Sequence, residues 1–167
     1  MSAIEVDLRL RSPHWSRVTA SADTVNDGNG LWVRADHDCS DPTDPEVLAS
    51  HPGRLAAIQI DGDEVILAQD RLRSWPLFWS LEDGVGGAQR LVISDDTTLM
   101  REAVSTPRLD ARARREFLDA GFVTGSDTLL AGIHQTEQGT VVRIDRATGR
   151  VRTINHSLGR FSEETDT

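Results

Sequence analysis

The sequence predicts an α+β domain made of two stacked, mostly antiparallel β-sheets with flanking helices. The chain has 167 residues, which is long enough for one domain and too short for two of ordinary size. Apolar and polar residues alternate over short stretches bounded by turn residues, a pattern typical of half-buried strands. Most of these stretches follow one another as hairpins, and hairpins build antiparallel sheets.

The first strand is predicted at residues 3–11, where Ile4, Val6, Leu8 and Leu10 alternate with polar residues. A loop rich in turn-forming residues, at residues 12–30, follows it. The remaining strands are predicted at residues 31–35, 55–60, 65–68, 76–81, 90–94, 141–144 and 151–154. Between 55–60 and 65–68 the turn contains Asp-Gly, which supplies the positive φ that a tight hairpin requires.

Two helices are predicted from their capping signals. Thr43 or Asp44 can cap a short helix that has a proline early in its first turn and ends before Pro52. Asp110 can cap a second helix that Gly121 ends as a C′ residue. On this second helix the apolar side chains share one face; they are Ala113, Phe117 and Leu118.

Charge and composition exclude several functions. The net charge of −9 disfavours binding to nucleic acid or to an anionic membrane surface, because both need clustered positive charge. No apolar run approaches the ~18 residues of a membrane-spanning helix, so a cytoplasmic protein is expected. Residues 1–156 are expected to form the domain, and the polar, acidic residues 157–167 a disordered tail.

The predicted reactive groups are few. Cys39 is the only cysteine, which excludes an internal disulfide and a cysteine-rich zinc site. Asp36-His37-Asp38-Cys39 collects metal-ligating residue types, but neighbours on an extended chain point to opposite faces and cannot share one ion. We therefore expect no metal and no cofactor. The other histidines are isolated and are expected at the surface; they are His14, His51, His134 and His156.

The large aromatic residues are candidates for an interface. Trp75, Trp79 and Phe122 are the best-placed anchors in a chain that has few aromatic residues, since exposed aromatic side chains often anchor binding. The alternative is that the tryptophans lie in the core.

Five stretches, in order, carry a specific combination of motifs: Asp70-Arg71-Leu72-Arg73-Ser74-Trp75-Pro76-Leu77-Phe78-Trp79, Leu91-Val92-Ile93-Ser94-Asp95, residues 109–123, residues 128–133 and residues 139–145. They resemble the D-R-x-G-x-K-P-L-Y-Y run, the F-A-S-E strand and the later segments of asparagine-synthetase-type amidotransferases. The resemblance covers about residues 53–152. It implies a reduced version of the family's N-terminal-nucleophile (Ntn) glutaminase domain, an αββα sandwich.

The chain departs from this family where catalysis is expected. The family opens M-C-G-I and uses its cysteine as the nucleophile, whereas Ser2 stands at that position here, and serine is the weaker nucleophile. The family's R-G-P and N-G-E segments are absent or unrecognisable, and no segment resembles its ATP-binding loop. Asp44 matches the aspartate that binds the substrate amine, although a helix cap explains it equally well.

The resemblance therefore implies a non-catalytic, glutaminase-like subunit that docks on a separately encoded synthetase-type enzyme in bacterial specialised metabolism. In the family this domain packs against the synthetase domain. β-Lactam-forming and lasso-peptide-cyclising enzymes resemble this chain in carrying a glutaminase-like domain without glutaminase function. Two alternatives stay open: a self-contained binding module or homodimer, and an amidohydrolase that depends on Ser2.

Overall fold

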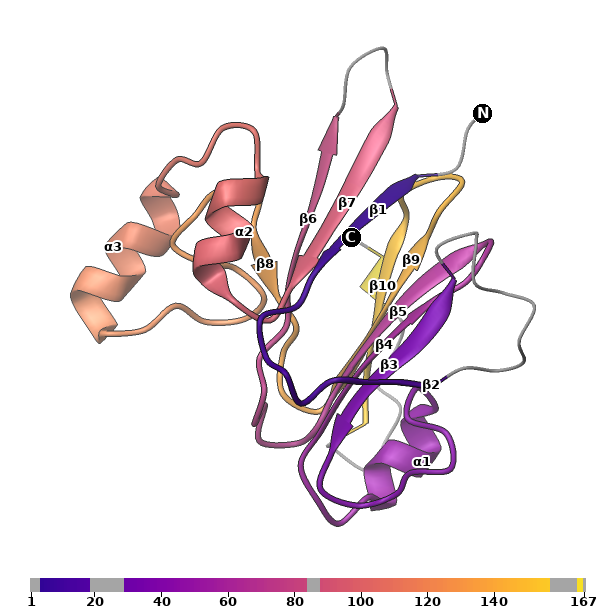
Figure 1. Ribbon diagram of the computed structural model, residues 1–167. Helices are drawn as coiled ribbons and strands as arrows, with labels where there is room; N and C mark the ends of the chain where they lie inside the picture. The colour runs from indigo at the N-terminus through magenta and orange to yellow at the C-terminus, as the bar shows by residue number, and fades with distance from the viewer. Residues whose placement is uncertain (1–3, 19–28, 84–87, 157–164, 167) are drawn as a thin grey trace.

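The computed structural model describes residues 4–18, 29–83, 88–156 and 165–166, which form two β-sheets and three short helices (Figure 1). Sheet A has the strand order β1-β7-β6-β8, and sheet B has the order β11-β10-β9-β5-β4-β3-β2. All strand pairs are antiparallel except β1 and β7, which run parallel. The predicted α+β class with mostly antiparallel sheets is confirmed.

The strand bounds agree with most of the predicted stretches. Sheet A contains β1 (Glu5–Arg9), β6 (Phe78–Asp83), β7 (Gln89–Ser94) and β8 (His134–Gln135). Sheet B contains β2 (Ser16–Val18), β3 (Gly30–Ala35), β4 (Leu55–Ile60), β5 (Glu64–Gln69), β9 (Thr140–Asp145), β10 (Val151–Asn155) and β11 (Thr165–Asp166). Strand β2 lies within the stretch predicted as a loop, and β11 lies within the predicted tail.

The two sheets pack face to face through their apolar inner sides. Alternate residues of the central strands point inward and are buried, as strand geometry requires. The inner core contains Ile4, Ala56, Ile58, Ile60, Val65, Leu67, Leu77, Trp79, Leu91, Ile93, Val142 and Ile144. Its members come from both sheets, so neither sheet can bury its inner face alone.

A short helix covers part of each outer face. Helix α1 (Pro45–Ser50) places Leu48 on the outer side of β4, β5 and β9. Helix α2 (Thr97–Ala103), which the sequence analysis did not predict, packs Met100 and Ala103 on Val92 of β7. The layers therefore run α2, sheet A, sheet B, α1. No helix among the described residues is long and apolar enough to cross a membrane.

The third helix, α3 (Ala111–Ala120), stands away from both sheets beside α2 (Figure 1). Its predicted ends are confirmed: the Asp110 carboxylate accepts a hydrogen bond from the Ala113 N–H at 2.8 Å, and Gly121 has a φ of 82°. Ala113 is the only buried residue of this helix. Its remaining apolar side chains are therefore exposed.

One buried carboxylate organises the connection from β5 to β6. Asp70 is 7% exposed, and its oxygens accept hydrogen bonds from the backbone N–H groups of Leu55, Leu72 and Ser74. In the turn that it holds, Arg73 has a φ of 52°, the only positive φ of a non-glycine residue among those described. A left-handed backbone costs an L-residue roughly 1–2 kcal/mol, a cost that glycine avoids.

We predict that Arg73→Gly is more stable than Arg73→Ala by about 1 kcal/mol, because only glycine relieves the left-handed backbone. Both variants lose the hydrogen bond from Arg73 Nη1 to Gln135 Oε1 at 2.5 Å, so the comparison isolates the backbone. Urea unfolding measures the two free energies. Equal stabilities, or a more stable alanine variant, would contradict a strained turn.

Candidate functional site

Of the two residues predicted for substrate chemistry, only Asp44 lies within the described part of the chain. Ser2 lies outside the described residues. Asp44 caps helix α1, where its carboxylate accepts a hydrogen bond from the Glu46 N–H at 2.8 Å. Asp44 therefore acts as a helix cap, which was the alternative to its role as a ligand of the substrate amine. A carboxylate in this position stabilises the first turn of the helix.

Trp79 cannot serve as an exposed anchor. It lies on β6, is 8% exposed, and packs in the core between the sheets. Its ring stacks on His134 of β8, with 4.5 Å between the ring centroids. Trp79 is therefore a core residue, which was the alternative to the interface role predicted for it.

Trp75 lies before β6, partly buried against the inner core. The Arg34 guanidinium carbon lies 4.3 Å from its ring centroid, and that of Arg54 lies 4.8 Å away. Arg54 in turn makes a two-pronged salt bridge to Asp36, at 2.8 and 3.0 Å. These cation–π contacts occupy the ring, so Trp75 offers little apolar surface to a partner.

Phe122 is exposed, as an anchor must be, and it belongs to a larger apolar group. The exposed fractions are 61% for Leu109, 43% for Phe117, 71% for Leu118 and 58% for Phe122. We call these four residues the α3 surface, because they lie on helix α3 or within two residues of its ends. They are four of the six exposed large hydrophobic residues among those described. Exposed apolar residues gathered on one element mark an interaction site better than scattered ones do.

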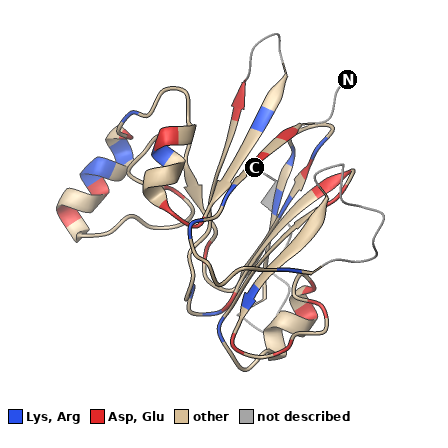
Figure 2. Ribbon diagram, in the orientation of Figure 1, with Lys and Arg blue, Asp and Glu red and all other residues tan. Residues whose placement is uncertain are grey.

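The first half of the same helix is basic, whereas Glu116 and Asp119 lie in its second half. Arg112, Arg114 and Arg115 lie in its first half, and Figure 2 shows them as blue bands on α3. Arg115 makes only a long, exposed contact to Asp119, at 3.9 Å. Such an exposed pair contributes little stability, so the Arg115 guanidinium remains accessible to a partner's carboxylate. The α3 surface therefore suits an apolar partner groove that is bordered by carboxylates.

The Asp36-His37-Asp38-Cys39 segment does not form a reactive centre. Burial raises the pKa of the Cys39 thiol, so the nucleophilic thiolate is disfavoured. The Asp36 carboxylate is taken up by Arg54. Within residues 4–18, 29–83, 88–156 and 165–166, no three metal-ligating side chains lie together.

Hollows among the described residues border sheet B in three places, and the smallest, of about 340 Å³, lies beside β2 and β3 with Cys39 in its lining. The other two are larger. One, of about 630 Å³, lies beside α1 and is lined by His37, His51, Asp70 and Arg71 among others. Both carboxylate oxygens of Asp70 already accept hydrogen bonds from backbone N–H groups. The second, of about 500 Å³, opens between the sheets beside β8 and is described next.

The hollow between the sheets brings Ser126, Asp127 and His134 together, three residue types that also occur in catalytic triads. The geometry is different from a triad. His134 Nδ1 lies 3.8 Å from the Asp127 carboxylate, beyond hydrogen-bond reach, and no hydrogen bond joins the Ser126 hydroxyl to His134 among the described residues. This arrangement does not activate Ser126 as a nucleophile.

Two histidines differ from the surface positions that were predicted for them. His134 is partly buried on Trp79, and His156 is 4% exposed, with its Nε2 2.9 Å from the Gln69 carbonyl oxygen. Burial lowers the pKa of both imidazoles. The sequence held no signal for this, because each histidine is isolated along the chain and is buried by strands distant in sequence.

No protein-family model matches this chain, and no curated protein matches it. The case for a function therefore depends on the residues and their geometry.

We predict that His156 destabilises the fold in acid. Because burial lowers its pKa in the folded state, the unfolded chain binds the proton more readily. The stability that the neutral imidazole provides is complete above the pKa of an unfolded histidine, about 6.5, and is lost as pH falls below it. The slope can reach about 1.4 kcal/mol per pH unit for one proton.

Urea unfolding of His156→Gln between pH 7.5 and 5 measures this effect. The variant should lose part of the pH dependence of the wild-type protein. His14→Gln is a suitable control, since His14 is exposed. Parallel pH profiles for the wild type and His156→Gln would show that His156 carries no such coupling.

Proposed function

We propose that this protein is a non-catalytic, glutaminase-like subunit that docks on a separately encoded, ATP-dependent amide-forming enzyme of the asparagine synthetase type. The exposed α3 surface is the observation that carries this proposal. It offers a partner four large apolar side chains next to three arginines. Apolar anchors surrounded by charge are the usual composition of a protein–protein interface.

The turn after β5 supports the resemblance to that family. In the family's D-R-x-G motif the glycine falls at Arg73, and Arg73 has the left-handed backbone that glycine favours. The motif's aspartate falls at Asp70, which organises this turn through backbone hydrogen bonds. If the chain descends from a protein with this motif, the left-handed backbone has been kept although arginine has replaced the glycine.

The layering is consistent with the same origin. Two mostly antiparallel sheets packed face to face, each with a helix on its outer face, have the order of an αββα sandwich. The chain would then be a reduced Ntn-type domain that keeps the scaffold. The Ser126, Asp127 and His134 group lacks the contacts of a triad, and Cys39 has a raised pKa, which favours a binding role over a catalytic one.

We predict that Phe117→Ser and Phe122→Ser each weaken binding to the synthetase-type enzyme encoded beside this protein, by about tenfold or more. Loss of a buried aromatic anchor commonly costs at least 1–2 kcal/mol of binding free energy. Isothermal titration calorimetry measures the affinity, and light scattering measures the mass of the complex.

Leu72→Ser provides the matched control, because Leu72 is 82% exposed but belongs to the turn after β5 and not to α3. It should bind as the wild type does. A wild-type protein that does not bind the enzyme, or α3 variants that bind at full strength, would rule out docking through this surface.

We also predict that the purified protein releases no ammonia from glutamine. An Ntn nucleophile needs the free α-amine of residue 2 as its base, and serine is a poorer nucleophile than cysteine. The assay uses protein whose initiator methionine has been removed, as verified by mass spectrometry. Ammonia release that Ser2→Ala abolishes would instead establish the amidohydrolase alternative.

A further inference from the structure

Strand β1 forms one edge of sheet A, and among the described residues only β7 pairs with it. Its inward side chains, Val6 and Leu8, pack on the inner core but are only partly buried. The edge strand of a sheet presents unpaired N–H and C=O groups that can pair with another strand. This edge is separate from the α3 surface.

The hydrogen bonds of neighbouring residues show which groups of β1 face outward. The Arg9 carbonyl oxygen accepts a hydrogen bond from Ser94 Oγ of β7, so Arg9 faces β7. The backbone N–H and C=O of Ile4 instead bond to Arg146, in the turn between β9 and β10. Because successive residues of a strand point their backbone groups to opposite sides, those of Val6 and Leu8 face away from β7.

The charges along β1 are self-complementary in one register. Its sequence is Glu5-Val6-Asp7-Leu8-Arg9. In an antiparallel pair of two copies centred on Asp7, Glu5 lies opposite Arg9 of the second copy, and Val6 lies opposite Leu8 of the second copy. The same register places the outward-facing backbone groups of Val6 and Leu8 opposite one another, as pairing requires.

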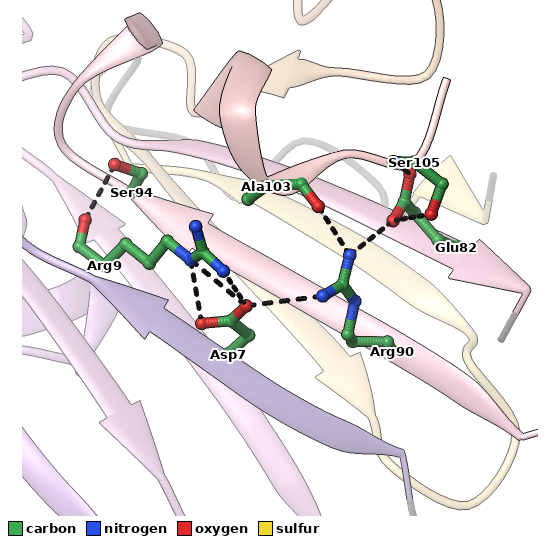
Figure 3. A network of polar contacts seen from close by, with 7 residues as sticks. All are labelled: Asp7, Arg9, Glu82, Arg90, Ser94, Ala103 and Ser105. Carbon is green, nitrogen blue, oxygen red and sulfur yellow. Dashed lines mark hydrogen bonds and ion pairs between the residues drawn. The ribbon is translucent and has the colours of Figure 1, made fainter. Parts of the chain in front are cut away.

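The like charges that meet at the centre of this pair are compensated. Asp7 accepts hydrogen bonds from Arg9, with a shortest distance of 3.0 Å, and lies 3.5 Å from Arg90 of β7 (Figure 3). Arg90 also binds Glu82, which Ser105 holds. Each Asp7 therefore brings two guanidinium groups of its own copy, those of Arg9 and Arg90, to the centre of the pair.

We infer that two copies of this chain associate through β1, antiparallel and centred on Asp7, so that their A sheets join into one continuous sheet. The two-fold symmetry is that of the commonest homodimers, in which each contact occurs twice. The occupant is a second copy because the charge sequence of β1 complements itself. The Glu5 side chain is exposed and makes no hydrogen bond or ion pair with the described residues, so it is available for this contact.

Charge reversal tests the register. Glu5→Arg turns both Glu5–Arg9 contacts of the dimer into repulsive ones and should weaken the dimer about tenfold or more. The same substitution reduces the overall negative charge, so a general repulsion between copies would predict tighter association. Glu5→Arg combined with Arg9→Glu restores opposite charges and should recover most of the affinity.

Sedimentation velocity over a range of protein concentrations measures the dissociation constants. Glu46→Arg, an equal charge change at an exposed position of helix α1, is the control and should leave association unchanged. Phe117→Ser should also dimerise normally, so failure of docking on the enzyme is distinguishable from failure of this inference. A wild-type protein that stays monomeric at millimolar concentration, or a dimer indifferent to Glu5→Arg, would overturn it.

Arg9→Glu also removes an internal contact to Asp7 and could prevent folding, so a measurement on the wild type complements the variants. In amide hydrogen exchange, the N–H groups of Val6 and Leu8 should become more protected as the protein concentration rises. Exchange at these two positions that does not depend on concentration would refute pairing through β1.

Discussion

The apolar contact between the two sheets is the interaction on which the other elements depend. Ile58, Leu67 and Ile93 are fully buried in it, and burying one such side chain contributes about 1.5–3 kcal/mol. Helices α1 and α2, of six and seven residues, are far shorter than the ~12–15 residues at which an isolated helix becomes marginally stable. They form because β4, β5 and β7 are apolar on their outer faces too. Of the three described helices, only α3 does not pack on the outer face of a sheet. Its apolar residues Phe117 and Leu118 are exposed for this reason.

Local patterns in the sequence predicted the local structure well. Alternation located the long strands, and the Asp110 and Gly121 signals located the ends of α3. Helix α2 was missed because Met100 and Ala103 give too few apolar repeats in one helical turn to reveal a face. The parallel pairing of β1 with β7 was invisible for a different reason. The partner of a strand is chosen by tertiary packing, and β7 is more than eighty residues away.

For the candidate site too, the sequence predicted local features but not those that depend on tertiary packing. Sequence reasoning singled out the aromatic residues, but it could not decide which of them would be exposed. Trp79 and Phe122 are both large aromatic residues, and only the packing of β6 between two sheets separates the core residue from the surface one. His156 is buried for the same non-local reason. The left-handed backbone of Arg73 was hidden as well, because arginine carries no sequence signal for a positive φ.

The parallel pair also sets an order of events during synthesis. Strand β1 is synthesised before its partner β7, which is complete only at Ser94. At translation rates of about 5–20 residues per second, β1 waits roughly 4–17 s for its partner. During that interval Val6 and Leu8 are exposed on an unpaired strand, which other nascent chains can reach. A chaperone that covers β1 during this interval would therefore prevent it from pairing with other chains.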